Sequence, residues 1–320
     1  MTPAIARRNF ILLVVVLVAL FLLQFVVPDY YVLTITRIMT LAVFAIGYNM
    51  LLGYIGLMSL GHAMFFAAGL YGAGLLTYHF GIAVPLAFLG GLITALLLAL
   101  VIGFLSLRTQ RVSFMIVTLM FSQVGFLMTL YFADATGGQD GLKLPHAARS
   151  FQLVGLTFDL TNEIVRFNLA FGLLLVALAI SFFILVSRRG RIFAAIRENE
   201  GRTEMLGFNV FAAKLEAFLY SGAIAGAGGA AYGLLDGYVG STFASIQYSI
   251  EVLLFTLLGG AGTLLGPLIG VALMTTMIDR LSEVTTAYLL VVGVVLIVIV
   301  LWFPKGILGT IRERWLPWLM

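Results

Sequence analysis

The sequence contains no cysteine, which excludes disulfide bonds, thiolate metal sites and cysteine nucleophiles. Charged residues are also scarce, at 10% of the chain, against about a quarter of a soluble domain. The three histidines, His62, His79 and His146, lie far apart, and the sequence has neither a Walker motif nor the spacing of a metal site or catalytic cluster. We therefore do not expect the chain itself to be an enzyme or to bind a metal or another cofactor.

Apolar residues make up 62% of the 320 positions and gather in runs of membrane length. This composition predicts an all-α, polytopic helical membrane protein with a single transmembrane domain over residues 1–320. The 35 glycines fit tightly packed transmembrane helices, because small residues let two backbones approach. The net charge of +4 is explained by basic residues at the membrane edge that meet anionic lipid, and it does not indicate nucleic-acid binding.

The apolar runs predict about eight full spans. One of them contains Gly222, Gly226 and Ala230 at every fourth position, which predicts a smooth helix face for close packing. The spans are expected near residues 10–27, 31–52, 55–78, 84–107, 112–132, 164–186, 215–235 and 287–303.

Two polar segments interrupt these spans and set the orientation. Residues 187–214 are strongly basic, and because Lys and Arg resist translocation, we expect this loop in the cytoplasm, where it meets a partner. Residues 133–163 carry more acidic than basic residues and lack an apolar run of membrane length, so we place them outside. The basic residues of the first segment are Arg188, Arg189, Arg191, Arg197, Arg202 and Lys214.

Residues 248–280 do not have the pattern of one continuous helix, because Gly259, Gly260 and Gly262 are followed by Pro267. A single crossing would leave the basic C-terminal segment outside. A break that returns the chain to the same side keeps both termini in the cytoplasm, so we expect a broken or re-entrant pair. Irregular backbone at membrane depth is buried in protein or lines an aqueous cavity. These four residues are therefore candidates for the translocation pathway.

A second pathway candidate is the small, polar run of Ser59, Gly61 and His62 within an apolar span. His62 either contacts substrate or holds a helix kink. A lone intramembrane histidine is more often a packed, hydrogen-bonded structural residue than a ligand.

The outer segment contains a cluster of turn residues. Gly137, Gly138, Asp140 and Gly141 are candidates for a docking surface for an external protein or for a gate at the mouth of the pathway. The alternative is a solvated turn, in which the glycines serve only their backbone freedom.

Five motifs, taken in order, resemble the membrane permease subunits of branched-chain amino-acid ABC importers, of the LivM/LivH type. Together they extend over most of residues 51–309, and the five in this order are far more specific than any one of them. They are GYIGLMSLGHAMFFAAGLYGA (53–73), TGGQDGL (136–142), GRIFAAIRENEGRTEMLGFNVFAAKLEAFLYSGAIAGAGGAAYG (190–233), GGAGTLLGPLIG (259–270) and FPKGILG (303–309).

The resemblance implies a type II-like importer fold in the bacterial cytoplasmic membrane. It also implies a second permease subunit (a paralogue in a heterodimer), a periplasmic or surface-tethered substrate-binding protein, and two cytoplasmic ATPases that carry ATP and Mg. In such proteins the loop at residues 190–209 docks on the ATPase, whereas the pattern alone fits an ordinary basic loop equally well. The residues singled out for this coupling are Arg191, Ile196, Arg197, Glu198, Asn199, Glu200, Leu206 and Gly207.

The expected function is import of branched-chain or other hydrophobic amino acids. Leu57 stands where many relatives have a polar residue, often Gln, and urea transporters of this kind tend to have Leu there, so a permease for urea, amides or other small organic solutes is the alternative. An ion-coupled secondary transporter would need a buried carboxylate within a span. A membrane-embedded enzyme would need a catalytic cluster.

Overall fold

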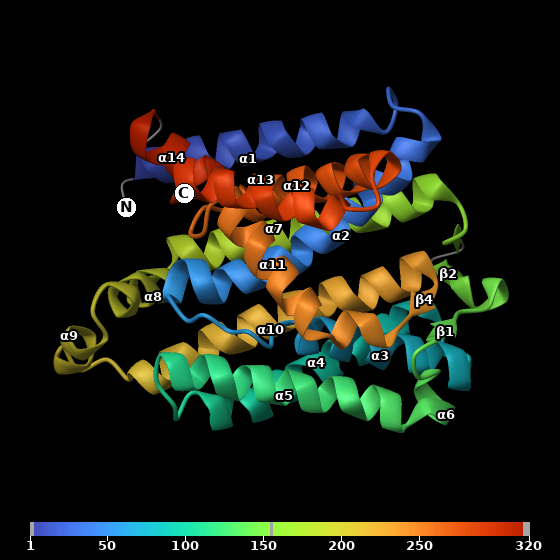
Figure 1. Cartoon of the computed structure of the whole chain (residues 1–320), viewed down its shortest axis with the longest axis horizontal. Coiled ribbons are helices and arrows are strands. Elements are labelled where there is room, and N and C mark those ends of the chain that lie inside the picture. The colour runs from blue at the N-terminus through green and yellow to red at the C-terminus, as the bar shows by residue number, and fades with distance from the viewer. Residues whose placement is uncertain (1–2, 154–155, 316–320) are drawn as a thin grey trace.

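The computed structural model describes residues 3–153 and 156–315. Its long helices run side by side, with α8 and α9 at one end of the bundle and four short strands at the other (Figure 1). The helices are α1 (Pro3–Leu23), α2 (Asp29–Asn49), α3 (Ala63–Phe80), α4 (Val84–Ser106), α5 (Val112–Tyr131), α6 (Ala133–Thr136), α7 (Glu163–Val186), α8 (Arg188–Glu198), α9 (Glu200–Met205), α10 (Val210–Asp236), α11 (Ile246–Gly259), α12 (Gly266–Val284), α13 (Tyr288–Trp302) and α14 (Ile307–Arg314).

The strands form two small antiparallel pairs. β1 (Leu142–Lys143) pairs with β4 (Tyr238–Val239), and β2 (Ser150–Leu153) pairs with β3 (Leu156–Asp159). We call the end that carries the strands the strand end. The opposite end, which carries α8, α9 and α14, is the basic end, and α1 begins there (Figure 1).

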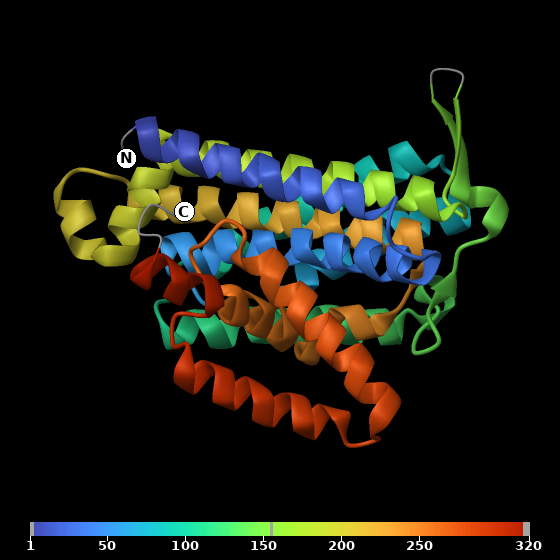
Figure 2. The ribbon, with the colours of Figure 1, turned by 90° about the horizontal axis from the view of Figure 1, so that it is seen from above.

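Five of the described helices are long and apolar enough to cross a membrane: α2 with its extension to Ile55, α4, α5, α7 and α10. The bounds of the last four match the expected spans closely. Shorter apolar helices, α11 and most of α13, complete the bundle. In Figure 2, α1 and α7 lie at one face and α13 at the opposite face, with α2 and α10 between them. The expected all-α, polytopic membrane class is confirmed.

Polar caps fix where several helices begin. The side chain of Asn162 accepts hydrogen bonds from the first turn of α7, and Ser187 accepts one from α8. Asn209 and Ser245 cap α10 and α11 in the same way. Each cap satisfies an amide that has no partner within its own helix, so the chain changes direction at a defined residue.

Helix α10 is the central helix, and its small residues allow α2, α3 and α4 to approach. A Cβ added to Gly226 would lie 2.1 Å from the Cβ of Ala95, and one added to Gly69 would lie 1.9 Å from the carbonyl oxygen of Gly226. A Cβ on Gly222 would lie 2.6 Å from Ala99. The smooth face expected from the four-residue repeat therefore packs directly against α3 and α4.

The span expected over residues 55–78 is helical only from Ala63 onward. Helix α2 continues as a π-helix (Met50–Ile55) that ends at Gly56 in the left-handed region, with φ of 80°. Residues 56–62 then return into the bundle as irregular backbone, which we call the first break. The hydroxyl of Tyr48 donates to the carbonyl of Ser59, and the amide of Leu60 donates to the hydroxyl of Thr118 (3.0 and 3.3 Å). These side chains satisfy backbone groups that lack helical partners.

The break expected within residues 248–280 is present. Helix α11 runs toward the basic end, the chain turns at residues 260–265, and α12 packs back along α11. We call residues 260–265 the second break. Gly260 and Gly262 both have positive φ, at 117° and 81°. Only glycine adopts such backbone without strain, which explains why the helix ends there.

Candidate functional site

The loop between α7 and α10 folds as two short helices that project from the basic end (Figure 1). Asn199 separates them, because its extended backbone ends α8 while its side chain accepts a hydrogen bond from the amide of Arg202 (2.9 Å) and so caps α9. Gly207 ends α9 with φ of 87°. Only glycine adopts this left-handed backbone without strain, which explains the glycine at this position. We call α8, α9 and residues 206–209 the α8–α9 hairpin.

The α8–α9 hairpin is anchored by its own apolar residues and by two ion pairs. Phe193 and Ile196 are buried, so Ile196 holds α8 to the bundle. The Nζ of Lys214 lies 2.6 Å from the Oε1 of Glu200, and a guanidinium nitrogen of Arg189 lies 3.0 Å from Glu216. The hairpin is therefore braced against α10.

The tip of the hairpin presents large apolar side chains. Met205 is 84% exposed, Leu206 70% and Phe208 45%. Arg191, Glu198 and Glu200 are also exposed. Leu206 was expected from the sequence, whereas Met205 and Phe208 were not. Three bulky apolar residues around a glycine within a charged loop are the sequence pattern that indicates such a tip.

Arg197 is also exposed as a residue, but its guanidinium reaches the bundle. Its guanidinium donates a hydrogen bond to the carbonyl of Gly53, which lies in the π-helix that extends α2. Its aliphatic stem lies against Gly56, where an added Cβ would be 3.1 Å from its Cγ. Among the residues expected to couple to a partner, Arg197 thus contacts the π-helix that extends α2, whereas Glu200 pairs with α10.

Ser59, Gly61 and His62 lie together in the first break and are all buried. The Nε2 of His62 lies 3.2 Å from the hydroxyl of Ser221, which in turn donates to the carbonyl of Gly47 (2.6 Å). The rings of Phe44 and Tyr48 lie 6.0 and 5.0 Å from the imidazole. Within the described residues, His62 is therefore a packed residue of the core.

The two breaks are joined through the start of α3. The backbone amide of Ala63, the first residue of α3, donates to the hydroxyl of Ser249 in α11 (3.0 Å). The helix that follows the first break thus begins against the helix that leads into the second.

The other four pathway candidates lie in the second break or next to it, near the basic end. Gly259, Gly260, Gly262 and Pro267 are all buried. Asn49 at the end of α2, which was not among the predicted pathway residues, holds this segment. Its side chain donates to the carbonyl of Thr263 and accepts from the amide of Gly262 (2.9 and 2.8 Å). A polar amide inside an apolar span was the signal for it.

An apolar cavity of about 410 Å³ lies between α3, α4 and α5. Its polar wall residues are Tyr71, Thr129 and Thr136, and the remaining walls are formed by aliphatic, aromatic, methionine and glycine residues. The three candidates of the first break do not line it. The structure therefore adds a third candidate for the pathway, which the sequence pattern did not reveal.

At the strand end, the turn cluster packs on β4. Gly137, Gly138 and Gly141 have positive φ, which explains the glycines. The hydroxyl of Tyr238 donates to the backbone carbonyl of Asp140 (3.2 Å). Asp140 itself is exposed. The cluster is thus a braced turn that presents a carboxylate to solvent.

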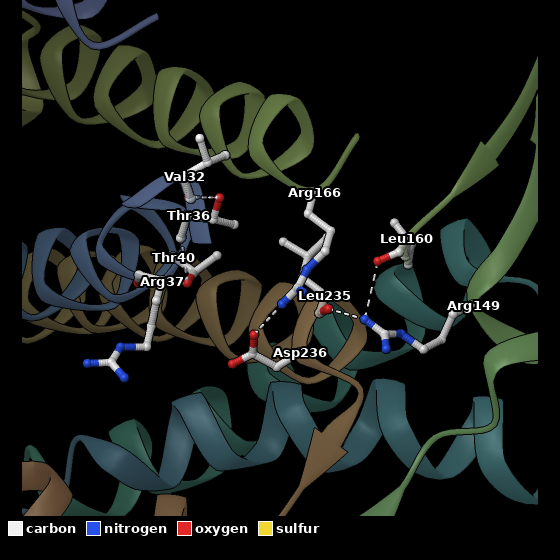
Figure 3. Close-up of polar contacts among 9 residues, drawn as sticks. All are labelled: Val32, Thr36, Arg37, Thr40, Arg149, Leu160, Arg166, Leu235 and Asp236. Atoms are coloured by element: carbon white, nitrogen blue, oxygen red, sulfur yellow. Dashed lines mark hydrogen bonds and ion pairs between the residues drawn. The ribbon is translucent and has the colours of Figure 1, made fainter. Parts of the chain in front are cut away.

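Two ion pairs cross between helices at the strand end. Arg37 on α2 pairs with Asp279 on α12, and Arg166 on α7 pairs with Asp236 on α10 (2.8 and 2.6 Å). Figure 3 shows Arg166 directed at Asp236, while the guanidinium of Arg37 points away from Asp236. These pairs join helices far apart in the sequence, so spacing could not reveal them.

Arg149 closes the end of α10 at this same place. Figure 3 shows its guanidinium directed at the carbonyls of Leu160 and Leu235, to which it donates hydrogen bonds. A cation at a helix C-terminus is favourable, because the last carbonyls there have no helical partner. Burial lowers the pKa of Arg149, and the charge of Arg166 lowers it further, yet arginine remains protonated at neutral pH.

Among the residues that the structure describes, no group of three or more His, Cys, Asp or Glu side chains is placed to hold a metal ion. The chemistry of these sites is therefore that of hydrogen bonds, ion pairs and apolar contact.

Relatives of the chain are permeases. The high-affinity branched-chain amino acid transport system permease protein LivM of Salmonella typhimurium is 27% identical over 302 residues, covering 87% of this chain and 70% of the relative. LivH of the same organism is 28% identical over 294 residues, covering 84% and 91%. A probable branched-chain amino acid transport permease protein LivM from Methanocaldococcus jannaschii is 25% identical, covering 70% and 73%. No solved structure matches the chain significantly.

The sequence profile of one protein family matches residues 30–301, which is most of the chain. That range extends from α2 through nearly all of α13 and includes both breaks and the α8–α9 hairpin. The family is described as "Branched-chain amino acid transport system / permease component". This multi-pass membrane protein therefore belongs to the family of branched-chain amino acid transport permeases.

Proposed function

We propose that this chain is one permease subunit of an ATP-driven importer for branched-chain or other small, largely apolar amino acids. A permease component of such an importer is not itself an enzyme. ATP with Mg would be bound by two cytoplasmic ATPases, and an external binding protein would deliver the substrate. The second permease would be a paralogue, because the relatives include both LivM and LivH proteins.

The main support for this proposal is the geometry of the α8–α9 hairpin. It projects from the basic end, is braced by two ion pairs, and has an apolar tip formed by Met205, Leu206 and Phe208. Exposed apolar residues that are held rigidly and surrounded by charge are typical of a protein interface. We infer that the ATPase binds here and that the basic end faces the cytoplasm of a bacterium, where basic residues gather.

The transport pathway we propose combines the two breaks with the apolar cavity between α3, α4 and α5. A cavity of about 410 Å³ with few polar wall residues suits an aliphatic side chain. The turn cluster at residues 137–141 would contact the binding protein, because Asp140 is exposed at the strand end. Urea or an amide would gain little from such apolar walls, since their groups need hydrogen-bond partners.

A ligand screen on the binding protein encoded with this permease tests the substrate class. We expect leucine, isoleucine and valine to bind, and urea and acetamide not to bind. Tight binding of urea alone would overturn the amino-acid assignment and would leave the permease assignment in place.

A further inference from the structure

We propose that Arg197 transmits movement of the α8–α9 hairpin to both breaks of the membrane-spanning part. This proposal rests on the proposed function, in which the hairpin is the part that the ATPases move. It separates two roles within the coupling loop. The tip binds the partner, whereas the guanidinium of Arg197 reaches into the bundle and links the hairpin to the pathway.

The first link is between Arg197 and the end of α2. Its Nη1 donates to the carbonyl of Gly53, and its stem lies against Gly56, where the first break begins. The absence of a side chain at Gly56 leaves room for this stem, since an added Cβ there would be 3.1 Å from the Cγ of Arg197. The π-helix at this place is a kind of helix distortion that often occurs at functional sites.

The second link is between Arg197 and the second break. A Cβ added to Gly262 would lie 2.8 Å from the Nη1 of Arg197, so the guanidinium sits directly against this backbone. The carbonyl of Gly262 also accepts a hydrogen bond from Arg312 of α14 (3.1 Å), and its amide donates to Asn49. One glycine of the second break is therefore held by α2, α8 and α14 together.

These links continue into the bundle. The first break leads directly to α3, and the second break follows directly on α11. The start of α3 is bonded to α11 through the amide of Ala63 and the hydroxyl of Ser249. A shift of α8 that pulls on Gly53 and Gly262 would thus reach both helices. Packed elements of this kind move as rigid bodies, so a small displacement at one end is carried to the other.

The chemistry of arginine suits this task. The guanidinium is always charged and holds its donors in a rigid plane, so it can contact two backbones at a fixed separation. Arg197 also lines two cavities at the basic end, of about 760 and 750 Å³. Truncation at this position would enlarge these spaces, and a neighbouring side chain would not replace the lost contacts.

The first test uses the whole transporter in proteoliposomes, with Arg197→Ala, Arg197→Lys and Arg191→Ala compared. We expect the Arg197→Ala chain to bind the ATPases as the unsubstituted chain does, and we expect the ATPases in that complex to hydrolyse ATP. The amount of leucine transported per ATP should fall about tenfold or more. Arg197→Lys should recover part of the loss, because an ammonium group can still donate to Gly53. Arg191 is exposed on the same helix, so Arg191→Ala should weaken ATPase association instead.

Two results would overturn the inference. If Arg197→Ala loses ATPase association, Arg197 is a docking contact. If Arg197→Ala keeps full transport per ATP, the link carries no movement. ATPase association of the unsubstituted chain reports separately on the proposed function, because it does not depend on what Arg197 does.

A second test needs no ATPase. The chain has no cysteine, so spin labels on Ala194→Cys in α8 and Ala261→Cys in the second break are the only labels it would carry. We expect one narrow distance distribution with Arg197 present and a broad one with Arg197→Ala, while helix content stays the same. An equally narrow distribution in both chains would contradict the proposed link.

Discussion

Asn49 is the residue that ties the end of α2 to the second break. It is 2% exposed and makes two hydrogen bonds with the backbone of Gly262 and Thr263. Asn49→Ala removes the side chain that makes both hydrogen bonds, so the buried amide of Gly262 and the buried carbonyl of Thr263 lose their partner. We expect the free energy of unfolding to fall by about 1–3 kcal/mol, measured from denaturant unfolding in detergent.

Asn168 provides the matched control for this measurement. Its side-chain amide donates to the carbonyl of Ile164 within α7, and the residue is exposed. Asn168→Ala should change the free energy of unfolding by less than about 0.5 kcal/mol. Equal stability of the Asn49→Ala protein and the unsubstituted chain would show that the clamp on the second break contributes nothing.

The sequence indicates which polar residues are unusual, but it does not show which partners they contact. Arg197, Arg37 and Asn49 all attract attention in the sequence because they are polar within or beside apolar spans. Their partners lie far away along the chain, so neither the inward direction of Arg197 nor the pairing of Arg37 with Asp279 could be derived. Such contacts depend on how the helices pack, which local spacing does not encode.

At the scale of elements, the small-residue face of α10 has a direct test. Gly226→Ala places a methyl group 2.1 Å from the Cβ of Ala95 and forces α10 and α4 apart. We expect a loss of about 1–3 kcal/mol from overpacking, measured as a lower unfolding midpoint. Gly172→Ala in α7 is the control, because an added Cβ there meets no atom within 4 Å. A midpoint for Gly226→Ala equal to that of the control would contradict a role for this close approach in the stability of the bundle.

The tip of the α8–α9 hairpin is the element predicted to bind the ATPase. Leu206→Asp places a charge on a side chain that is 70% exposed, so the fold should survive while the apolar contact with the partner is lost. Glu198→Lys should weaken association as well, because it reverses an exposed charge. Co-purification with the ATPase measures both, and Gly201→Ala, an exposed change on the same hairpin, should leave it intact. Full co-purification of the Leu206→Asp chain would count against the hairpin as the docking element.

Element bounds were predicted best where long apolar runs decide them. The spans expected at 84–107, 112–132 and 164–186 coincide with α4, α5 and α7 within a residue or two. The first break was missed, because Leu57, Met58 and Leu60 keep residues 56–62 apolar enough to join the expected span and no proline lies among them. The second break was found, because glycines followed by proline remove helix propensity and a backbone donor. Breaks made by tertiary contact are thus less visible in sequence than breaks made by composition.

On the scale of the whole molecule, the ion pair of Arg37 with Asp279 joins α2 to α12 at the strand end. A double-mutant cycle with Arg37→Leu and Asp279→Leu should give a coupling of about 1 kcal/mol, since both side chains are partly exposed. Arg280 and Glu283 form a more exposed pair at 3.7 Å on α12 and serve as the control, with a smaller expected coupling. Equal coupling in the two cycles would show that the cross-helix pair does not hold these helices together.

The most direct test of the whole account is leucine uptake by proteoliposomes that contain the complete transporter. We expect uptake only when the ATPases, internal ATP and the loaded binding protein are all present, and we expect it to disappear with Leu206→Asp. Uptake by this chain alone, driven by an ion gradient and without any ATPase, would contradict the account.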